Sequence, residues 1–306
     1  MFYYKIYGLK VASDFQLHEA LELNHDEIKS IDVTICEEKL PAKVVGDTDE
    51  EIQKGEVNTY CVEKNRAWFR WYGQAAFMVI DGKQIRYQCL PGYDKMFVSA
   101  LILCLAFFYI LLQREMIAMH GSGLVWNGKT IIISGESGSG KSSLAEAILK
   151  QGAKFLADDT VAVDVRAEGI YATPAYPQQK LCEDQITEEM WRMYNIVTLP
   201  KDGGVVKYGV RMPDRFCEEP QKLDSLIIIQ KEDITEPKIR EITGADKMKY
   251  ITKNLYKYEN YVKVGMSVEI FKKCISVANS TNIFILSRPA LGMTVDQQVE
   301  LLRRTL

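Results

Sequence analysis

The cysteines of this sequence lack any CxxC spacing. There are seven of them, an odd number, scattered along the chain as Cys36, Cys61, Cys89, Cys104, Cys182, Cys217 and Cys274. Zinc sites and disulfide frameworks depend on clustered or paired cysteines. The pattern therefore argues against both, and it is typical of reduced thiols that fill space in a cytoplasmic protein.

An excess of positive charge is also missing. The 306 residues include 38 lysines and arginines against 41 aspartates and glutamates, which gives a formal net charge of −3. Proteins that bind along a nucleic-acid backbone usually present a broad basic surface, so we expect no nucleic-acid partner. Hydrophobic residues make up 47% and charged residues 26%. This composition predicts a globular protein with room for one large domain or two modest ones.

The first residues, MFYYKIYGLKVASDF, have no basic region followed by a long apolar run, so no signal peptide is expected. A long apolar run does occur later, from Met96 to Leu112, and it is just short of the usual membrane-spanning length. It fits either a membrane anchor or a helix that is buried in an α/β core, with Asp94 as its cap. We expect the buried helix and no membrane partner, because the chain resumes at once as a strand.

Residues 1–93 are rich in strand-forming residues, and residues 94–306 alternate between strand and helix patterns. Asp81-Gly82 and Asn127-Gly128 are strong signals for tight β-hairpins, one in each part. The aromatic cluster WFRWY in the first part fits a sheet face against the core or a surface that grips a peptide. In the second part, the strand KTIIISG, the helix SSLAEAILKQG and the strand KFLADDTVAVDV follow one another.

The run GESGSGKS between that strand and that helix matches the pattern G-x-x-x-x-G-K-[ST] of a phosphate-binding loop. In such a loop the backbone N–H groups surround the phosphates, helped by the N-terminus of the helix. Lys141 supplies a charge toward the β- and γ-phosphates, and the Ser142 hydroxyl can ligate Mg²⁺. We therefore predict ATP and Mg²⁺ as cofactors. The predicted nucleotide-binding residues are Gly135, Glu136, Ser137, Gly138, Ser139, Gly140, Lys141, Ser142 and Ser143.

Two adjacent carboxylates, Asp158 and Asp159, follow the next strand. Adjacent side chains on a strand point to opposite sides, so one can face a metal ion and the other an acceptor. As a functional pair they fit a Mg²⁺ ligand and a general base for a hydroxyl. The alternative is a turn or a pair of solvated acids at a strand end. His120, just before the hairpin, fits either a structural histidine or a member of the same site.

This set of motifs, with His120, the loop, the helix, Ala157 and the two aspartates in order, resembles the catalytic domain of the HPr serine kinase/phosphorylase family. That family is similar in fold to phosphoenolpyruvate carboxykinase. The wider chain resembles stand-alone relatives such as the kinases that modify lasso-peptide precursors. The segments that carry this wider resemblance are Tyr7–Leu9, Pro174–Asp184, Lys207–Phe216 and Ile242–Tyr256.

The resemblance implies an α/β fold with two parts. These are an N-terminal β-rich domain at residues 1–93 and a P-loop kinase domain of the HPr kinase/phosphoenolpyruvate carboxykinase-like type at residues 94–306. It further implies that Asp158 is the general base that deprotonates an acceptor serine, and that His120 adjusts the charge and orientation of that carboxylate. Lys141 would complete the catalytic set, while Asp159 and Ser142 would help to hold the metal.

The chain departs from the family in one respect. The E-x-R-G-x-G signature of the two-activity enzymes does not occur in it. The resemblance therefore does not extend to phosphorylase activity or to HPr as the substrate, and it leaves only Glu183 and Asp184 as candidates for a further acidic metal ligand. Three cations, Lys180, Lys207 and Arg211, fit either a clamp on phosphate or an acidic acceptor, or ordinary surface solvation.

The leading hypothesis is a Mg²⁺-dependent kinase that transfers the γ-phosphoryl group of ATP to a serine hydroxyl of a peptide or small protein. The same catalytic parts would also serve a kinase for a metabolite or a free amino acid. A compact polar cavity near Asp158 would favour that small acceptor, and an open groove beside the N-terminal part would favour a peptide. A nucleotide-dependent regulatory module without chemistry is the third hypothesis.

Overall fold

The first part of the chain forms one large sheet. The computed structural model describes residues 1–24, 26, 28–46, 58–199 and 206–306. Among these residues, eight strands pair in the order β3-β1-β2-β4-β8-β7-β6-β5. The strands are β1 (Phe2–Ile6), β2 (Leu9–Ser13), β3 (Leu21–Glu22), β4 (Val33–Glu37), β5 (Asn58–Val62), β6 (Arg66–Trp71), β7 (Ala75–Ile80) and β8 (Gln84–Cys89).

Both predicted hairpins form. Asp81 and Gly82 join β7 to β8 with φ angles of 52° and 62°, the left-handed pair that a type I′ turn requires. Asn127 and Gly128 do the same later in the chain, with φ angles of 49° and 74°. The aromatic cluster packs as a sheet face, since Phe69 is 2% exposed and stacks on Phe77.

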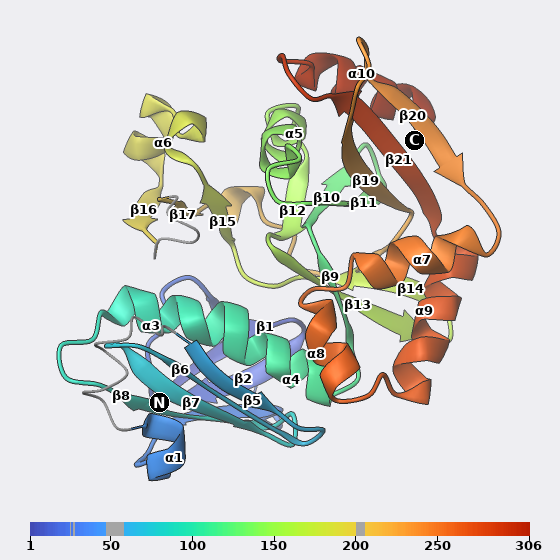
Figure 1. Cartoon of the computed structure of the whole chain (residues 1–306). Helices are drawn as coiled ribbons and strands as arrows, with labels where there is room; N and C mark the ends of the chain where they lie inside the picture. The colour runs from blue at the N-terminus through green and yellow to red at the C-terminus, as the bar shows by residue number, and fades with distance from the viewer. Residues whose placement is uncertain (25, 27, 47–57, 200–205) are drawn as a thin grey trace.

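The long apolar run forms a helix that lies along this sheet (Figure 1). It consists of α3 (Lys95–Leu101), the π-helical turn η2 (Ile102–Ala106) and α4 (Phe107–Gln113). Asp94 caps it as predicted, because its Oδ1 accepts the N–H groups of Met96 and Phe97 at 2.7 and 3.1 Å. By length and composition alone the helix could span a membrane, and 67% of its most apolar 18-residue stretch is buried inside the protein.

Beside this layer lies a mixed sheet with helices on both faces (Figure 1). Within the described residues its order is β12-β10-β11-β19-β21-β20, and β11, β19 and β21 are parallel neighbours. Isoleucines and leucines alternate along these three strands between two separate core clusters, one against α5 and α10 and the other against α9. The strands are β10 (Ser122–Trp126), β11 (Lys129–Gly135), β12 (Lys154–Ala157), β19 (Ser225–Glu232), β20 (Lys238–Ile242) and β21 (Asn282–Pro289).

Two smaller sheets complete the strand pairing of the described residues. One has the order β18-β14-β13-β9, and the other, β15-β17-β16, projects beside α6 (Figure 1). Their strands are β9 (Ile117–His120), β13 (Thr160–Arg166), β14 (Gly169–Thr173), β15 (Gln178–Leu181), β16 (Asn195–Thr198), β17 (Tyr208–Arg211) and β18 (Gln221–Lys222). The helices outside the long apolar one are α1 (Ala42–Val45), α5 (Lys141–Leu149), η3 (Glu183–Gln185), α6 (Glu188–Met193), η4 (Pro213–Arg215), α7 (Asp246–Lys253), α8 (Tyr258–Lys263), α9 (Val268–Ser280) and α10 (Val295–Thr305).

The chain is thus a mixed α/β protein with several sheets. The domain boundary between residues 93 and 94 stays a prediction. The helix that follows it contacts β7 in the first part and β9 in the second. One buried core cluster runs from Tyr4 and Phe77 in the first part to Val161 and Ile285 in the second. All seven cysteines are free.

Phe108 packs the long apolar helix against the segment around α8, and its removal tests that contact. The ring is fully buried, and it lies 5.3 Å from the ring of Tyr256 and 6.1 Å from that of Tyr261. Phe108→Ala is expected to lower the free energy of unfolding by about 3–5 kcal/mol, because it leaves a cavity between α4 and the rings of Tyr256 and Tyr261. Urea unfolding followed by tryptophan fluorescence measures the change. Val268→Ala, at a side chain that is 70% exposed, is the control and should shift it by less than about 0.5 kcal/mol.

Candidate active site

The glycine-rich loop lies where a parallel strand ends and a helix begins. β11 ends at Gly135 and α5 starts at Lys141, which is the predicted strand, loop and helix. Gly135, Gly138 and Gly140 have φ angles of 139°, 72° and 107°, in the region that favours glycine. A Cβ atom on Gly135 would lie 2.5 Å from the carbonyl oxygen of Ile229. Only glycine therefore lets the loop pass this close to β19.

Two cations hold the carbonyl groups of this loop. The Lys141 ammonium donates to the carbonyls of Gly135 and Glu136 at 2.8 and 3.0 Å. On the other side, Nε of Arg288, at the end of β21, donates to the carbonyl of Ser139 at 2.8 Å. The Ser139 hydroxyl is buried without a hydrogen-bond partner. The loop is thus fixed by its carbonyl oxygens, and a buried hydroxyl inside it remains available to a ligand.

The two carboxylates lie in the turn that carries the chain from the six-stranded sheet to the four-stranded one. Asp158 follows β12, and Asp159 precedes β13 with a left-handed φ of 69°. The expectation that strand alternation separates the pair is therefore wrong, because this turn interrupts the strand. Asp158 accepts the Ser122 hydroxyl at Oδ1 (2.7 Å) and the Lys180 N–H at Oδ2 (2.8 Å). Oδ2 of Asp159 pairs with the Lys180 ammonium at 2.8 Å.

The pKa values of the two carboxyl groups move in opposite directions. Burial raises the pKa of Asp158, and the hydrogen bonds from the Lys180 N–H and the Ser122 hydroxyl only partly offset it. Burial alone would also raise the pKa of Asp159, but the neighbouring Lys180 ammonium lowers it to about 2. Asp159 is therefore held as an anion, whereas Asp158 takes up a proton more readily than an ordinary aspartate.

His120, the last residue of β9, lies in the same neighbourhood. Its backbone N–H donates to the carbonyl of Asn254 at 2.8 Å, and the centre of its ring lies 5.7 Å from that of Tyr256 in an edge-to-face arrangement. Burial and the nearby Lys141 charge lower the pKa of His120, while the two carboxylates oppose that shift. The imidazole is therefore biased toward its neutral form at pH 7.

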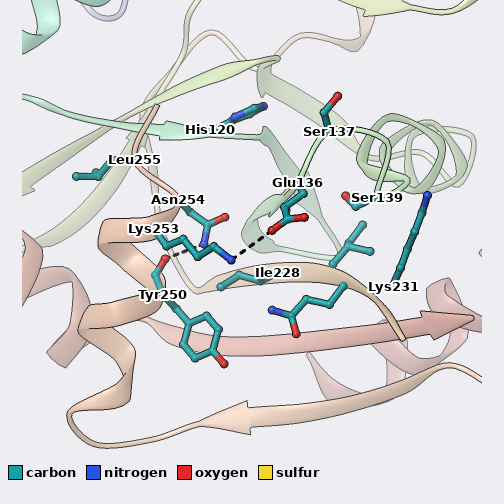
Figure 2. Close-up of a pocket in the computed structure, with 13 residues that line it drawn as sticks. His120, Glu136, Ser137, Ser139, Ile228, Lys231, Tyr250, Lys253, Asn254 and Leu255 are labelled. Atoms are coloured by element: carbon teal, nitrogen blue, oxygen red, sulfur yellow. Dashed lines mark hydrogen bonds and ion pairs between the residues drawn. The ribbon is translucent and has the colours of Figure 1, made fainter. Parts of the chain in front are cut away.

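A pocket of about 440 Å³ lies between the loop, the end of β19 and α7. Figure 2 shows it with the loop on one side and α7 on the other, and the Lys253 ammonium spans the two to reach Glu136 at 3.3 Å. Asn254 Nδ2 donates to the carbonyl of Tyr250 at 2.7 Å. The lining residues are His120, Gly135, Glu136, Ser137, Ser139, Ile228, Ile229, Gln230, Lys231, Tyr250, Lys253, Asn254 and Leu255. The two aspartates are not among them.

Not all predicted residues meet at this place. Ser142 and Ser143 lie on the first turn of α5, half-buried and exposed respectively. Glu183 and Asp184 are exposed on the turn η3, and among the described residues no group of three histidine, cysteine, aspartate or glutamate side chains is arranged to hold a metal ion.

The three undecided cations separate into two places. Lys180 contacts both carboxylates. Lys207 is also near, because its charge helps to lower the pKa of Asp159, although burial, Lys180 and His120 have larger effects on that pKa. Arg211 instead lies near Glu19, whose pKa is raised by burial and lowered slightly by Arg211. Sequence reasoning missed Ser122 and Arg288. Ser122 stands two residues after His120, whereas nothing near Arg288 in the sequence links it to the loop.

The Asp159–Lys180 pair leads to a prediction on stability. Asp159→Asn is expected to lower the free energy of unfolding at pH 7 by about 1–3 kcal/mol, because Lys180 loses its counterion. The folded pKa of about 2 lies below the value of about 4 for an unfolded aspartate. The stabilisation is therefore complete above about pH 5 and is lost as the pH falls toward 2.

Urea unfolding at pH 7 and at pH 3 measures this effect. The difference between variant and wild type should be smaller at pH 3. Asp164→Asn is the control, because Asp164 pairs with Arg166 at the surface, where such pairs contribute about 0–1 kcal/mol. An equal loss at both pH values for Asp159→Asn would contradict the prediction.

Comparisons with known proteins add little to this geometry. No family model matches the sequence, and no curated protein does. Among solved structures, the chain is similar to the Hpr(Ser) kinase/phosphatase from Coxiella burnetii, with 14% sequence identity and a TM-score of 0.33. The match covers 61% of this chain and 95% of that chain. At this identity and TM-score, the likeness carries no argument about the reaction, which rests on the residues of the site.

Proposed function

We propose that this protein is a Mg²⁺-dependent kinase that transfers the γ-phosphoryl group of ATP to a hydroxyl group. One observation carries the proposal: the loop lysine and the two carboxylates share one electrostatic neighbourhood. β11, which leads into the loop, pairs with β10, and the Ser122 hydroxyl of β10 donates to Asp158. Burial lowers the pKa of Lys141, and the charges of Asp159 and Asp158 oppose that shift. A phosphate-binding loop next to a poised base is the arrangement that phosphoryl transfer to a hydroxyl needs.

The loop supports the binding of the phosphates. Its positive-φ glycines open the space around the chain, and a Cβ atom on Gly138 would meet nothing within 4 Å. The N-terminus of α5 adds a partial positive charge at the same place. Lys141 now donates to two loop carbonyls, and a phosphate that enters the loop would exchange one or both of these bonds for charge-assisted ones.

The residues present also fit Mg²⁺. The lowered pKa keeps Asp159 an anion at neutral pH, and the Ser142 hydroxyl offers a second hard oxygen. Mg²⁺ usually takes one or two carboxylates, phosphate oxygens and several waters, so a cluster of three acidic side chains is not required. When bound, the ion would neutralise charge that develops on the phosphate oxygens.

Asp158 is the proposed general base. Ser122 and the Lys180 N–H each occupy one lone pair of a carboxylate oxygen, which leaves a further acceptor site on each. In the step, Asp158 takes the proton of the acceptor hydroxyl, the hydroxyl oxygen bonds to the γ-phosphorus, and ADP leaves with the electrons of the broken P–O bond. Its raised pKa suits it to this transfer, because a base acts best when its pKa approaches the working pH.

The 440 Å³ pocket is the proposed place for the nucleoside. The carboxylates follow β12, which reaches β11 through β10, whereas the pocket is lined by the end of β19 on the other side of β11. A nucleotide whose phosphates lie in the loop would therefore extend its γ-phosphate toward Asp158 and its base toward Tyr250. The aromatic ring and Gln230 supply a stacking face and an amide for a base.

We further propose a serine of a peptide or small protein as the acceptor, on the resemblance of the motif set. One structural feature favours a peptide over a free metabolite. Trp191 and Met193 on α6 are 54% and 60% exposed, next to the small sheet that carries Lys180. Each of these side chains offers exposed apolar surface that a bound peptide would cover. A cytoplasmic location completes the proposal.

Asp158→Asn separates chemistry from binding. We expect phosphoryl transfer to fall by about 10²–10⁴-fold, the usual effect of a general base, while ATP affinity stays within about threefold because Asp158 does not touch the loop. The rate of phosphoryl transfer is measured with γ-labelled ATP and Mg²⁺. The acceptors are serine peptides encoded near the gene, and free serine. Isothermal titration with ATP measures the affinity.

Asp164→Asn, on the strand β13 that follows the two aspartates, is the matched control and should keep full activity. Label on free serine rather than on a peptide would favour a small-molecule kinase. Tight ATP binding without label on any acceptor and without ATP consumption would favour a nucleotide-dependent regulatory module.

Ser122→Ala tests the environment of the base. The Ser122 hydroxyl lowers the pKa of Asp158, so its loss should raise that pKa further. Because the base works only when ionised, the acid limb of the pH–rate profile should move to higher pH, with a larger loss at pH 6 than at pH 8.5. A uniform loss across this range, measured as kcat/KM against pH, would contradict the assignment of Asp158.

A further inference from the structure

Lys180 contacts both carboxylates through different atoms. Its backbone N–H donates to Oδ2 of Asp158, and its ammonium pairs with Oδ2 of Asp159, each at 2.8 Å. The two side chains of the ion pair are only 22% and 28% exposed. One residue of β15 therefore contacts both acids and sets their positions.

The surroundings of Lys180 offer few other anions. Burial alone would lower the pKa of Lys180, but Asp159 raises it, and the next influences come from the Cys104 thiol and the Tyr256 hydroxyl. Burial raises the pKa of the Tyr256 hydroxyl well above its usual value, so this group is neutral at pH 7. Asp159 is therefore the main counterion of this ammonium, and a second cation that reaches Asp159 must compete with it.

We propose that Lys180 is a positioning residue whose N–H orients Asp158 and whose ammonium group holds Asp159 until a divalent cation bound to the nucleotide takes that carboxylate. The inference rests on the proposed function, since it requires a metal–nucleotide complex at this site. It goes beyond that function by assigning to this lysine the control of metal affinity.

The physical reason is repulsion between adjacent acids. Two carboxylates that are partly removed from water disfavour each other's ionised form unless a cation lies close to them. The Lys180 ammonium supplies that cation before the nucleotide arrives, and its flexible stem lets it move away without displacing the strand. The backbone bond to Asp158 does not depend on the side chain, so the base keeps its orientation during the exchange.

Two substitutions separate the ammonium from the N–H group. Lys180→Met keeps the backbone donor and the length of the side chain but removes the competing charge. Lys180→Arg keeps the charge and adds a planar fork that binds carboxylates with two hydrogen bonds. The proposal therefore predicts opposite changes in metal affinity, stronger for Met and weaker for Arg. A purely structural role would predict losses in both or a change in neither.

The experiment is a titration of Mn²⁺ into the full chain at pH 8 with saturating ADP. The electron paramagnetic resonance signal of free Mn²⁺ measures how much of the ion is bound. We expect the Kd for Mn²⁺ to be about three- to tenfold lower in Lys180→Met and at least about threefold higher in Lys180→Arg. Lys154→Met, at an exposed lysine on the neighbouring β12, is the matched control and should leave the Kd unchanged. Thermal melting without nucleotide shows whether each variant is folded.

The outcomes separate this inference from the proposed function. If wild type binds ADP and Mn²⁺ but the Met and Arg variants leave the Kd for Mn²⁺ unchanged or weaken it equally, the role of Lys180 is overturned and the kinase proposal stands. If Lys180→Met weakens ADP binding equally with and without Mn²⁺, Lys180 is a phosphate ligand instead. If wild type binds no nucleotide, the proposed function and the inference fall together.

Discussion

Two neighbouring carboxylates in a half-buried turn need a cation close to them, and the architecture of the site follows from that requirement. Lys180 meets it from β15, a strand of the small sheet that is otherwise separate from the main one. The turn itself carries the chain between two sheets, so the pair stands where three sheets converge. The same convergence brings in His120 through the pairing of β9 with β13, and the glycine loop through β11. The small sheet must therefore lie close enough to the turn for Lys180 to reach both carboxylates.

The opposite pKa directions of Asp158 and Asp159 show how environment divides roles between identical side chains. Both are removed from water, but only Asp159 has an ammonium partner, whereas Asp158 is held by a hydroxyl and a backbone N–H. The group with the cation stays an anion, and the group with neutral donors accepts protons more readily. Sites that combine a metal ligand with a general base require this division. The ammonium group that makes the two pKa values differ comes from Lys180 on β15, a strand of another sheet.

Sequence patterns predicted the local elements of the fold well because their causes are local. The Asp81-Gly82 turn requires positive φ angles at two adjacent residues, and the Asp94 cap satisfies N–H groups two and three residues away. The loop between β11 and α5 is likewise a contiguous motif. In contrast, the contacts of Lys180 and Arg288 depend on how separate sheets pack, which no spacing encodes. The same limit applies to the long apolar helix, whose pattern indicates burial but does not indicate which sheet covers it.

Under the proposed function, the occupied cations and the free acceptor positions of Asp158 bear on the choice between transfer to a hydroxyl and hydrolysis. Lys141 and Lys180 now bind protein oxygens, the loop carbonyls and Asp159. A polyphosphate that enters the loop would take the Lys141 ammonium from these carbonyls. Asp158, already bonded on both oxygens, retains room for one further donor on each. In the proposed reaction, a hydroxyl delivered by a bound acceptor would fill that place in a fixed orientation, whereas a free water would have to be ordered at an additional entropic cost.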